Sequence, residues 1–387
     1  MRKIAVITSA RSDYSYLLPV MRKIQEDPEL QLIPIVTGMH LSPVYGMTVK
    51  QIEEDGFEIA ERVEMLLSSD SSSAIAKSMG VEMIGLSQAY DRLKPDVIVL
   101  LGDRFETLAA AAAALPFTIP IGHIAGGELT EGLIDEASRH AITKLSHLHF
   151  VSNERHRQRV IQMGEAPWRV INCGAPSLDN LHCIEFLDKE TLQKELGFNL
   201  DPAPLLVTFH PVSLEFEQTG DQMMEFLGAL DKSGLPVIFT YPNADTSNRV
   251  VIEAIQKYQM VHSNSRVYVN LGIRRYFSLM HFAAAMVGNS SSGIIEAASF
   301  ALPVVNVGNR QKGRFHDRNV LDTPCEQNSI LAAIQQSVDP QFKERLSGMG
   351  NPYGDGHASE MIVKTLRDTE VGKTLITKGF YDLPIKD

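Results

Sequence analysis

The segment HIAGGELTEGLIDEASRHAITK, residues 123–144, is the part of the chain densest in groups that could do chemistry. Within it, Glu128 follows two glycines, which allow a backbone to approach a ligand closely. Asp135 and Arg139 are four residues apart, so on a helix they share one face. This pair fits either a catalytic site or an ion pair on a helix surface. Carboxylates grouped in this way could move protons to and from a substrate.

Three further candidates follow apolar runs that are typical of buried strands. Asp103, in GDRFE, is either a helix cap or a catalytic base at the carboxyl end of a strand. His210, in FHPVS, is either a structural histidine or an imidazole that shuttles a proton or binds phosphate. Arg11, in SARSDYS, is not explained by helix capping.

Two loops in the second half of the chain suit a phosphate or diphosphate. GNSSSG, residues 288–293, precedes a helix that we expect to begin near Ile294. Free N–H groups at a helix start bind phosphate, and three serines exceed what one helix cap needs. Glu296 lies one turn later, where it either binds ribose hydroxyls or is a favourable first-turn charge. In the next loop, GNRQKGR, Arg310 either is solvated or holds a diphosphate with its bidentate guanidinium.

The composition argues against several other classes of protein. A net charge of −11 disfavours binding to nucleic acid or to an anionic membrane through the whole surface. The nicotinamide fingerprint GxGxxG and the triphosphatase loop GxxxxGKS/T are both missing. The three cysteines form no CxxC pair, which disfavours structural zinc and favours a reducing cytoplasm. No apolar run reaches the roughly 18–20 residues of a membrane span.

Short β-branched apolar runs alternate with helix-period stretches and must position these loops. Several of the runs are apolar throughout, as strands covered on both faces are. The alternation predicts parallel sheets flanked by helices, in which ligands bind beyond the carboxyl ends of strands. The length of 387 residues favours two domains. We predict an α/β fold with two Rossmann-like, doubly wound domains at 1–188 and 204–353, a linker at 189–203, and a helix and tail at 354–387 that could pack back on the N-terminal domain.

The candidate motifs occur in a recognisable order: RSDYS, TGMHL, GDRFE, HIAGGE, DEASRHAITKLSH, HPV, PNAD, GNSSSG and GNRQKGR. In this ordered set the chain resembles the hydrolysing UDP-N-acetylglucosamine 2-epimerases of sialic-acid and related nonulosonic-acid synthesis. The resemblance covers about residues 3–320 and continues to FYDLP near the tail. It implies a GT-B-like fold with the active site in the cleft between the domains, and neither metal nor nicotinamide.

The resemblance also implies roles for the domains and for individual residues. The N-terminal domain would act on the sugar and the C-terminal domain would bind UDP. A homo-oligomer, dimer or tetramer, is implied, with no cofactor and no nucleic-acid or membrane partner. The implied catalytic residues are Asp103, Glu128, Asp135, Arg139 and His210. The implied UDP ligands are Arg11, Ser15, Arg104, His210, Asn243, Ser290, Ser291, Glu296 and Arg310.

The implied reaction converts UDP-N-acetylglucosamine and water into N-acetylmannosamine and UDP. One position departs from the family pattern, because relatives carry Glu or His where this chain has Ala125. Either another acid takes over that proton transfer, or the sugar differs. A small alanine would make room for UDP-N,N′-diacetylbacillosamine, a 6-deoxy sugar with a second acetamido group used for legionaminic-acid-type sugars. A GT-B glycosyltransferase, a non-hydrolysing epimerase and a nucleotide-sugar sensor are more distant alternatives.

The chemistry of such a sugar favours elimination before hydration. The C2 proton is barely acidic, so the C1–O bond weakens first, helped by fixed positive charge and amides around the diphosphate. A carboxylate then takes the C2 proton, which gives a glycal and UDP. Water adds at C1 and a proton returns to C2 from the other face, which inverts that centre. Asp103, Glu128 and Asp135 are enough acids to serve both faces.

Overall fold

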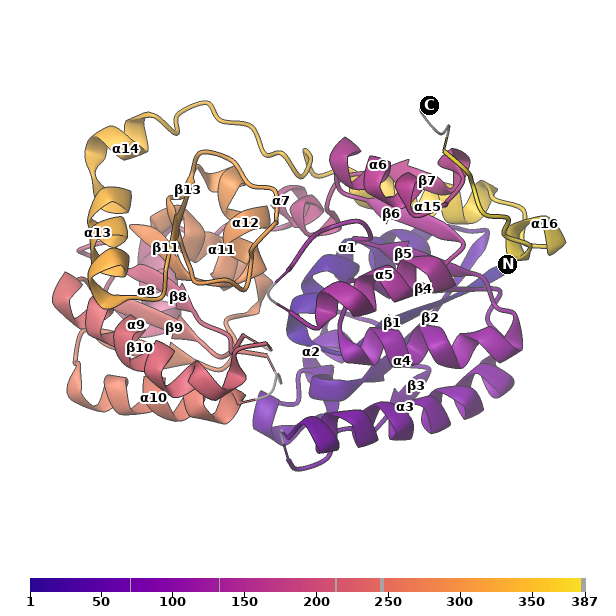
Figure 1. Cartoon of the computed structure of the whole chain (residues 1–387), viewed down its shortest axis with the longest axis horizontal. Coiled ribbons are helices and arrows are strands. Elements are labelled where there is room, and N and C mark those ends of the chain that lie inside the picture. Colours follow the sequence, from indigo (N-terminus) through magenta and orange to yellow (C-terminus); the bar gives the residue numbers. More distant parts are fainter. Residues whose placement is uncertain (70, 132, 213, 244–246, 384–387) are drawn as a thin grey trace. The chain divides into compact units, whose positions relative to one another are not determined.

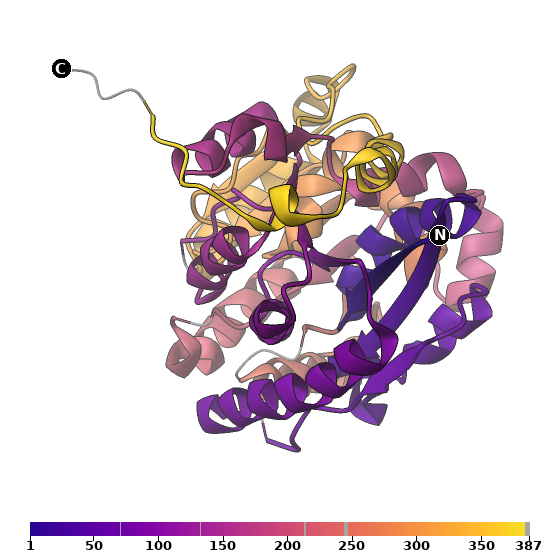
Figure 2. The same ribbon diagram turned by 90° about the vertical axis from the view of Figure 1, so that its right-hand side faces the viewer.

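The chain forms two compact units in the computed structural model, which describes residues 1–69, 71–131, 133–212, 214–243 and 247–383 (Figure 1). Unit 1 comprises Met1–Glu128, Asp135–Cys183 and Tyr353–Asp387. Unit 2 comprises Leu129–Ile134 and Ile184–Pro352. The C-terminal segment, in yellow, therefore belongs with the N-terminal half of the chain, and Figure 2 shows it lying over the elements of unit 1.

Unit 1 alternates strands with helices from its first residues. Its elements are β1 (Arg2–Thr8), α1 (Arg11–Glu26), β2 (Leu30–Thr37), α2 (Val49–Glu54), β3 (Glu61–Val63), α3 (Ser72–Leu93), β4 (Val97–Leu101), α4 (Phe105–Ala114), β5 (Ile121–Ile124), α5 (Asp135–Leu145), β6 (Leu148–Val151), α6 (Glu154–Gln162), β7 (Val170–Asn172), α7 (Asn180–Cys183), α15 (Ala358–Asp368) and α16 (Lys373–Ile376).

Unit 2 follows the same alternation. Its elements are α8 (Lys189–Leu196), β8 (Leu205–Thr208), α9 (Thr219–Ser233), β9 (Val237–Thr240), α10 (Asn248–Val261), β10 (Ser265–Tyr268), α11 (Gly272–Phe282), β11 (Ala285–Gly288), α12 (Ser291–Ile295), β12 (Val304–Val307), β13 (Val320–Thr323), α13 (Gln327–Val338) and α14 (Pro340–Glu344).

Each unit is built on one parallel sheet. Within the described part of the chain, unit 1 has seven strands in the order β3-β2-β1-β4-β5-β6-β7, and unit 2 has six in the order β10-β9-β8-β11-β12-β13. Both orders reverse between the first and fourth strands of the unit, which is the doubly wound arrangement. The predicted fold class, α/β with two Rossmann-like units, is confirmed.

The unit 1 core explains why its strands read as continuous apolar runs. All five residues of β4 are buried, because helices cover both faces of the sheet. Each buried valine or leucine contributes about 1.5–3 kcal/mol to the free energy of folding. The alanines of α4 pack in the same core, and their small side chains let α4 lie close to α3. This packing fixes the direction in which the residues after β4 leave the sheet.

Two local predictions differ from the structure. Residues 189–203, interpreted as a linker, contain α8, because Asp188 caps the helix by accepting the Thr191 N–H at 2.9 Å and Leu192 is buried. The helix expected near Ile294 begins three residues earlier, at Ser291, because Ser290 takes the N-cap position. In both cases the capping residue decides where the helix begins.

Candidate active site

Loops at the carboxyl edge of the unit 1 sheet carry the candidate acids. Asp103 follows β4, Glu128 follows β5, and Asp135 is the first residue of α5. Strands β4 and β5 are hydrogen-bonded neighbours, so the loops after them begin side by side. The sheet therefore brings the loops of Asp103 and Glu128 together within unit 1.

Arg139 on α5 joins these loops and is almost fully buried, with 1% of its surface exposed. Its guanidinium forms an ion pair with Asp103 and donates to the Glu128 backbone oxygen and to Glu136 Oε2, each at 3.0 Å. A buried guanidinium is stable only when its donors are paired. These contacts therefore fix Arg139 and, through it, the positions of Asp103 and of the Glu128 backbone. The alternative of an ion pair on a helix surface is wrong for Arg139.

Asp103 does not cap the helix that follows it. Helix α4 begins at Phe105, and its N-cap position is taken by Arg104 without a side-chain cap hydrogen bond. The Asp103 side chain instead binds Arg139 and stays 20% exposed. A carboxylate that is oriented by an arginine and remains partly exposed can reach a substrate proton.

Glu128 is held from the side of β6 and α6. It is 2% exposed, and its Oε1 accepts a hydrogen bond from Ser152 Oγ at 3.4 Å. Ser152 Oγ in turn lies 2.9 Å from His156 Nδ1. Gly127 has φ +77° and a Cβ there would come within 2.5 Å of the His156 backbone oxygen, so the loop needs glycine to press against α6.

A second buried cluster surrounds Arg104, which is 8% exposed. Its Nε and Nη2 donate to the two carboxylate oxygens of Glu106 at 3.2 and 3.0 Å. Burial raises the pKa of Glu106, and Arg104 opposes that rise. Burial likewise raises the pKa of Asp13, whose carboxylate accepts from the Ser9 hydroxyl at 2.6 Å. Glu106 therefore sets the orientation of the Arg104 guanidinium.

The remaining unit 1 candidates lie at the start of α1. Arg11 is the first residue of this helix, and its N-cap, Ala10, makes no side-chain cap hydrogen bond. Ser15 is one turn further along and donates its hydroxyl to the Ser12 backbone oxygen at 2.7 Å. Both residues follow β1, at the same edge of the sheet as the loops of Asp103 and Glu128.

In unit 2, His210 follows β8, and its backbone is held by the side chain of Asn289, which is 1% exposed. Asn289 Oδ1 accepts the His210 backbone N–H at 2.7 Å, and its Nδ2 donates to the His210 backbone oxygen at 2.9 Å. His210 Nδ1 accepts the Asn243 backbone N–H at 3.2 Å. A neutral imidazole that accepts at Nδ1 carries its proton on Nε2, so His210 offers an Nε2–H donor.

The serine-rich turn is fixed by the loop after β12. Arg310 Nη1 and Gln311 Nε2 both donate to the Asn289 backbone oxygen, at 3.1 and 2.8 Å. Ser290 accepts the Ser292 N–H at 3.4 Å and so caps α12, with Ser291 as the first helical residue. Gly288 cannot be replaced, because a Cβ there would lie 2.0 Å from the Thr208 backbone oxygen. Backbone amides of this turn are thus held in place by side chains from the next loop.

Glu296 does not fit the alternative of a favourable charge in the first turn of the helix. It follows the last residue of α12 and is only 4% exposed. The sequence-predicted residues therefore fall into one group per unit. Unit 1 holds Arg11, Ser15, Asp103, Arg104, Glu128, Asp135 and Arg139, and unit 2 holds His210, Asn243, Ser290, Ser291, Glu296 and Arg310.

Sequence reasoning missed Glu106, Asn289 and Gln311. All three lie inside the motifs that carry the candidate residues, so their positions could have marked them as site residues. Their partners are Arg104, the His210 backbone and the Asn289 backbone. What they do depends on contacts made after folding, and local spacing does not encode those contacts.

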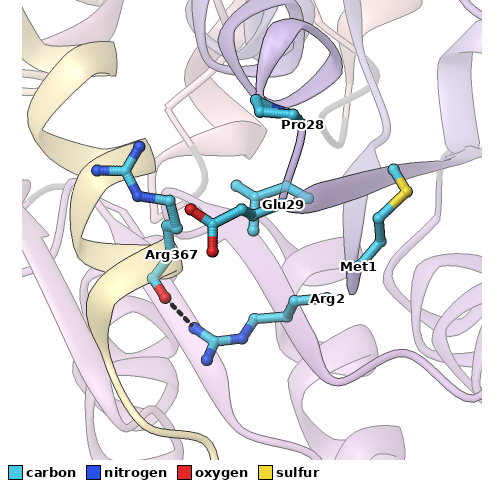
Figure 3. A pocket seen from close by; sticks show the side chains of 6 residues that line it. Met1, Arg2, Pro28, Glu29 and Arg367 are labelled. Atoms are coloured by element: carbon cyan, nitrogen blue, oxygen red, sulfur yellow. Dashed lines mark hydrogen bonds between the residues drawn. The ribbon is translucent and has the colours of Figure 1, made fainter.

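A pocket of about 370 Å³ lies at the opposite edge of the unit 1 sheet, where β1 and β2 begin (Figure 3). Its basic side chains are already engaged, since Arg2 donates to the Arg367 backbone oxygen at 2.9 Å and Arg367 pairs with Asp27 at 3.0 Å. Glu29 adds a negative charge to the lining. The pocket is therefore a poor anion site and lies away from the loops described above.

Within the described residues, no group of three or more His, Cys, Asp or Glu side chains is arranged to hold a metal ion. None of the helices described is both long and apolar enough to span a membrane.

The sequence matches a family model over residues 22–367, and the family is described as UDP-N-acetylglucosamine 2-epimerase. A GDP/UDP-N,N′-diacetylbacillosamine 2-epimerase (hydrolyzing) of Campylobacter jejuni is 39% identical over 99% of both chains. A UDP-N,N′-diacetylbacillosamine 2-epimerase (hydrolyzing) of Legionella pneumophila is 37% identical over 98% of this chain and 99% of its own. A UDP-N-acetylglucosamine 2-epimerase of Neisseria meningitidis is 32% identical over 99% of this chain and 100% of its own.

A solved structure shares the fold. The crystal structure of UDP-GlcNAc 2-epimerase from Neisseria meningitidis bound to UDP-GlcNAc has a TM-score of 0.80 with this chain. The match covers 95% of this chain and 100% of the other at 20% sequence identity.

Proposed function

The chain belongs to the UDP-N-acetylglucosamine 2-epimerase family, and on that premise we propose that it converts UDP-N,N′-diacetylbacillosamine and water into UDP and the free sugar inverted at C2. The predicted enzyme class, a hydrolysing UDP-sugar 2-epimerase, is confirmed. The observation that carries the chemistry is the pairing of Asp103 with buried Arg139, which also binds the backbone of Glu128.

The choice of sugar departs from our first expectation, UDP-N-acetylglucosamine. The relatives named for the diacetylated sugar are 37–39% identical to this chain, against 32% for the relative named for UDP-N-acetylglucosamine. Ala125 agrees with the bulkier sugar, because its methyl group leaves room where other family members carry Glu or His.

In the proposed reaction, unit 2 holds the nucleotide. The amides of the Ser290 turn, the Arg310 guanidinium and the Nε2–H of His210 bind the diphosphate and stabilise its negative charge as the C1–O bond breaks. Asn243 and Glu296 bind the nucleoside side, and Ser291 adds a hydroxyl. The Arg11, Ser15 and Arg104 side chains of unit 1 complete the set of UDP ligands.

The acids of unit 1 act on the sugar. As positive charge builds at C1, one carboxylate takes the C2 proton, and the products of this step are a glycal and UDP. We assign that step to Asp103, because among the candidate acids it is the partly exposed one whose side chain is paired with Arg139. Water then adds at C1 and C2 receives a proton on the opposite face. Glu128 and Asp135 are the candidates for that second transfer.

The test is proton NMR in D2O with three separate substrates: UDP-N,N′-diacetylbacillosamine, its GDP counterpart and UDP-N-acetylglucosamine. We expect free UDP and a free sugar carrying deuterium at C2 from the first, with at least tenfold slower turnover of the others. Faster turnover of UDP-N-acetylglucosamine would return the assignment to our first expectation. Recovery of an epimerised nucleotide-sugar would indicate a non-hydrolysing epimerase. Dependence on an added acceptor would indicate a glycosyltransferase.

A further inference from the structure

We propose that His123, which the sequence did not mark as a site residue, is a positioning residue. It holds together three segments of unit 1: the loop that carries Asp103, the loop that carries Glu128, and helix α5. The inference rests on the proposed function, because it concerns how Asp103, Glu128 and Arg139 are kept in place. His123 lies on β5 and is fully buried, so it acts through its neighbours and does not touch the substrate.

The first contact of His123 fixes the loop of Asp103. His123 Nε2 lies 2.7 Å from the backbone oxygen of Gly102, the residue before Asp103. A carbonyl oxygen only accepts, so Nε2 must carry the proton. Gly102 has φ +75°, a conformation that a side chain other than glycine's rarely adopts. The imidazole therefore stabilises the unusual turn from which Asp103 leaves β4.

The second contact fixes helix α5. His123 Nδ1 lies 3.2 Å from Thr143 Oγ1, and Thr143 is fully buried one turn beyond Arg139. Because Nε2 holds the proton, Nδ1 accepts and the Thr143 hydroxyl donates. One ring thus joins the loop of Asp103 to the helix whose arginine binds Asp103.

The third contact is one of close packing against the loop of Glu128. A Cβ at Gly126 would lie 3.1 Å from His123 Nδ1 and 3.1 Å from Thr143 Oγ1. The backbone of HIAGGE therefore lies directly on the histidine–threonine pair, and a side chain at Gly126 would push that pair aside by a few tenths of an ångström. A displaced imidazole would shift this loop together with the other two segments.

The protonation state suits a positioning role. Burial, against the opposing hydrogen bond to the Gly102 carbonyl and with smaller contributions from His149 and His140, lowers the pKa of His123 to about 3. The ring is neutral near pH 7, with one donor and one acceptor, and each has its partner. An ordinary core histidine would also be neutral, but its two hydrogen bonds would not both end on segments that carry the candidate acids.

Two isosteric substitutions separate the two hydrogen bonds. His123→Gln places an amide N–H near the position of Nε2 and keeps the bond to Gly102, whereas His123→Asn places its amide near Nδ1 and loses that bond. We expect His123→Asn to lower kcat about 10- to 100-fold, since displacements of about 1 Å have effects of that size. His123→Gln should recover most of the loss, and both variants should bind UDP as the parent protein does.

Thr143→Val should lower kcat and Thr143→Ser should not.

A readout that does not depend on turnover keeps this proposal separate from the proposed function. Hydrogen exchange of the Gly102 amide, which donates to the Ile124 oxygen at 2.9 Å, should be faster in His123→Asn than in His123→Gln. The 15N spectrum of the parent protein should show the Nε2–H tautomer from pH 6 to pH 8. Equal kcat and equal exchange in the two variants, or a parental Nδ1–H tautomer, would overturn the inference. If no sugar is turned over by the parent protein, the proposed function fails while exchange and tautomer still decide the role of His123.

Discussion

The two units share the order of their first six strands, yet their candidate site residues are held by different kinds of interaction. In unit 1 the side chains are charged and bind each other, as in the Arg139–Asp103 and Arg104–Glu106 pairs. In unit 2 the side chains bind backbone, as Asn289 does at His210 and Gln311 does at Asn289. The same strand order therefore supports two ways of holding the residues at the carboxyl edge of the sheet, by ion pairs between side chains and by side chains bound to backbone.

The difference follows from what each edge must do in the proposed reaction. A nucleotide diphosphate needs amides and hydrogen-bond donors held in fixed positions, and neutral side chains can fix a backbone without adding charge. Proton transfer needs carboxylates whose orientation and ionisation are controlled, and a buried guanidinium does both. The comparison predicts that substitutions among the acids of unit 1 change turnover and that substitutions at the serine-rich turn of unit 2 and its neighbours change UDP affinity.

The largest expected effect is that of Asp103→Asn. The amide keeps the shape of the side chain but cannot take a proton, so we expect kcat to fall by about 10²–10⁴. UDP affinity, measured by calorimetry, should stay within about twofold of the parent value. The exposed Asp91→Asn on α3 serves as a control with the same loss of charge. If Asp103→Asn weakened UDP binding as much as it slowed turnover, the division between the units would be wrong.

Arg310→Ala tests the other side of the comparison. The substitution removes a guanidinium from the Asn289 carbonyl and from the proposed diphosphate site, and hydrogen bonds to charged groups contribute about 1.5–3 kcal/mol. We expect UDP to bind about 10- to 100-fold more weakly, with a smaller change in kcat at saturating substrate. Arg318→Ala, at an exposed position of the same unit, should leave UDP affinity unchanged. Parental UDP affinity in Arg310→Ala would remove this residue from the nucleotide site.

Asn289→Ala is expected to have a smaller effect on binding and a measurable effect on stability. The His210 N–H and carbonyl would lose their partner in a buried position, which costs about 1–3 kcal/mol. We expect about tenfold weaker UDP binding and a lower thermal unfolding midpoint, with Asn264→Ala as an exposed control. An unchanged midpoint would mean that water or a shifted side chain satisfies these groups.

The sequence predicted the sheets and the edge at which the candidate residues gather. Continuous apolar runs such as β4 are typical of strands covered on both faces, and the carboxyl ends of parallel strands must share an edge. On that basis the sequence predicted that Asp103 and Glu128 lie at one edge of the sheet, whereas the place of Arg139 beside them came from the family resemblance. The partners of buried polar groups were not predictable, since His123 meets Gly102 and Thr143 at separations of about 20 residues. Such contacts depend on strand order and side-chain direction, which motif spacing does not report.

The smallest expected effect concerns Glu82, a fully buried carboxyl on α3 close to the Arg104–Glu106 pair. Burial and the neighbouring Glu106 raise the pKa of Glu82 well above its usual range, and Thr37 and Arg104 oppose that rise only in part. The folded protein thus holds a proton that the unfolded chain releases above about pH 4.5. The stability contributed at Glu82 is therefore fully present below that pH and is lost as the pH rises toward the folded-state pKa.

Glu82→Gln should remove this pH dependence, because the amide resembles the protonated acid. We expect equal thermal midpoints for variant and parent at pH 4, and at pH 8 a variant that is more stable by about 1–2 kcal/mol, or a few degrees. Turnover at saturating substrate should not change, because Glu82 is not among the proposed binding or proton-transfer residues. Scanning calorimetry across pH 4–8, with the exposed Glu58→Gln as control, measures the difference. A stability difference that is the same at both ends of the pH range would show that Glu82 is ionised in the folded protein. Unit 1 would then bury an additional negative charge next to the Arg104–Glu106 pair, whereas the comparison with unit 2 describes its buried charges as paired.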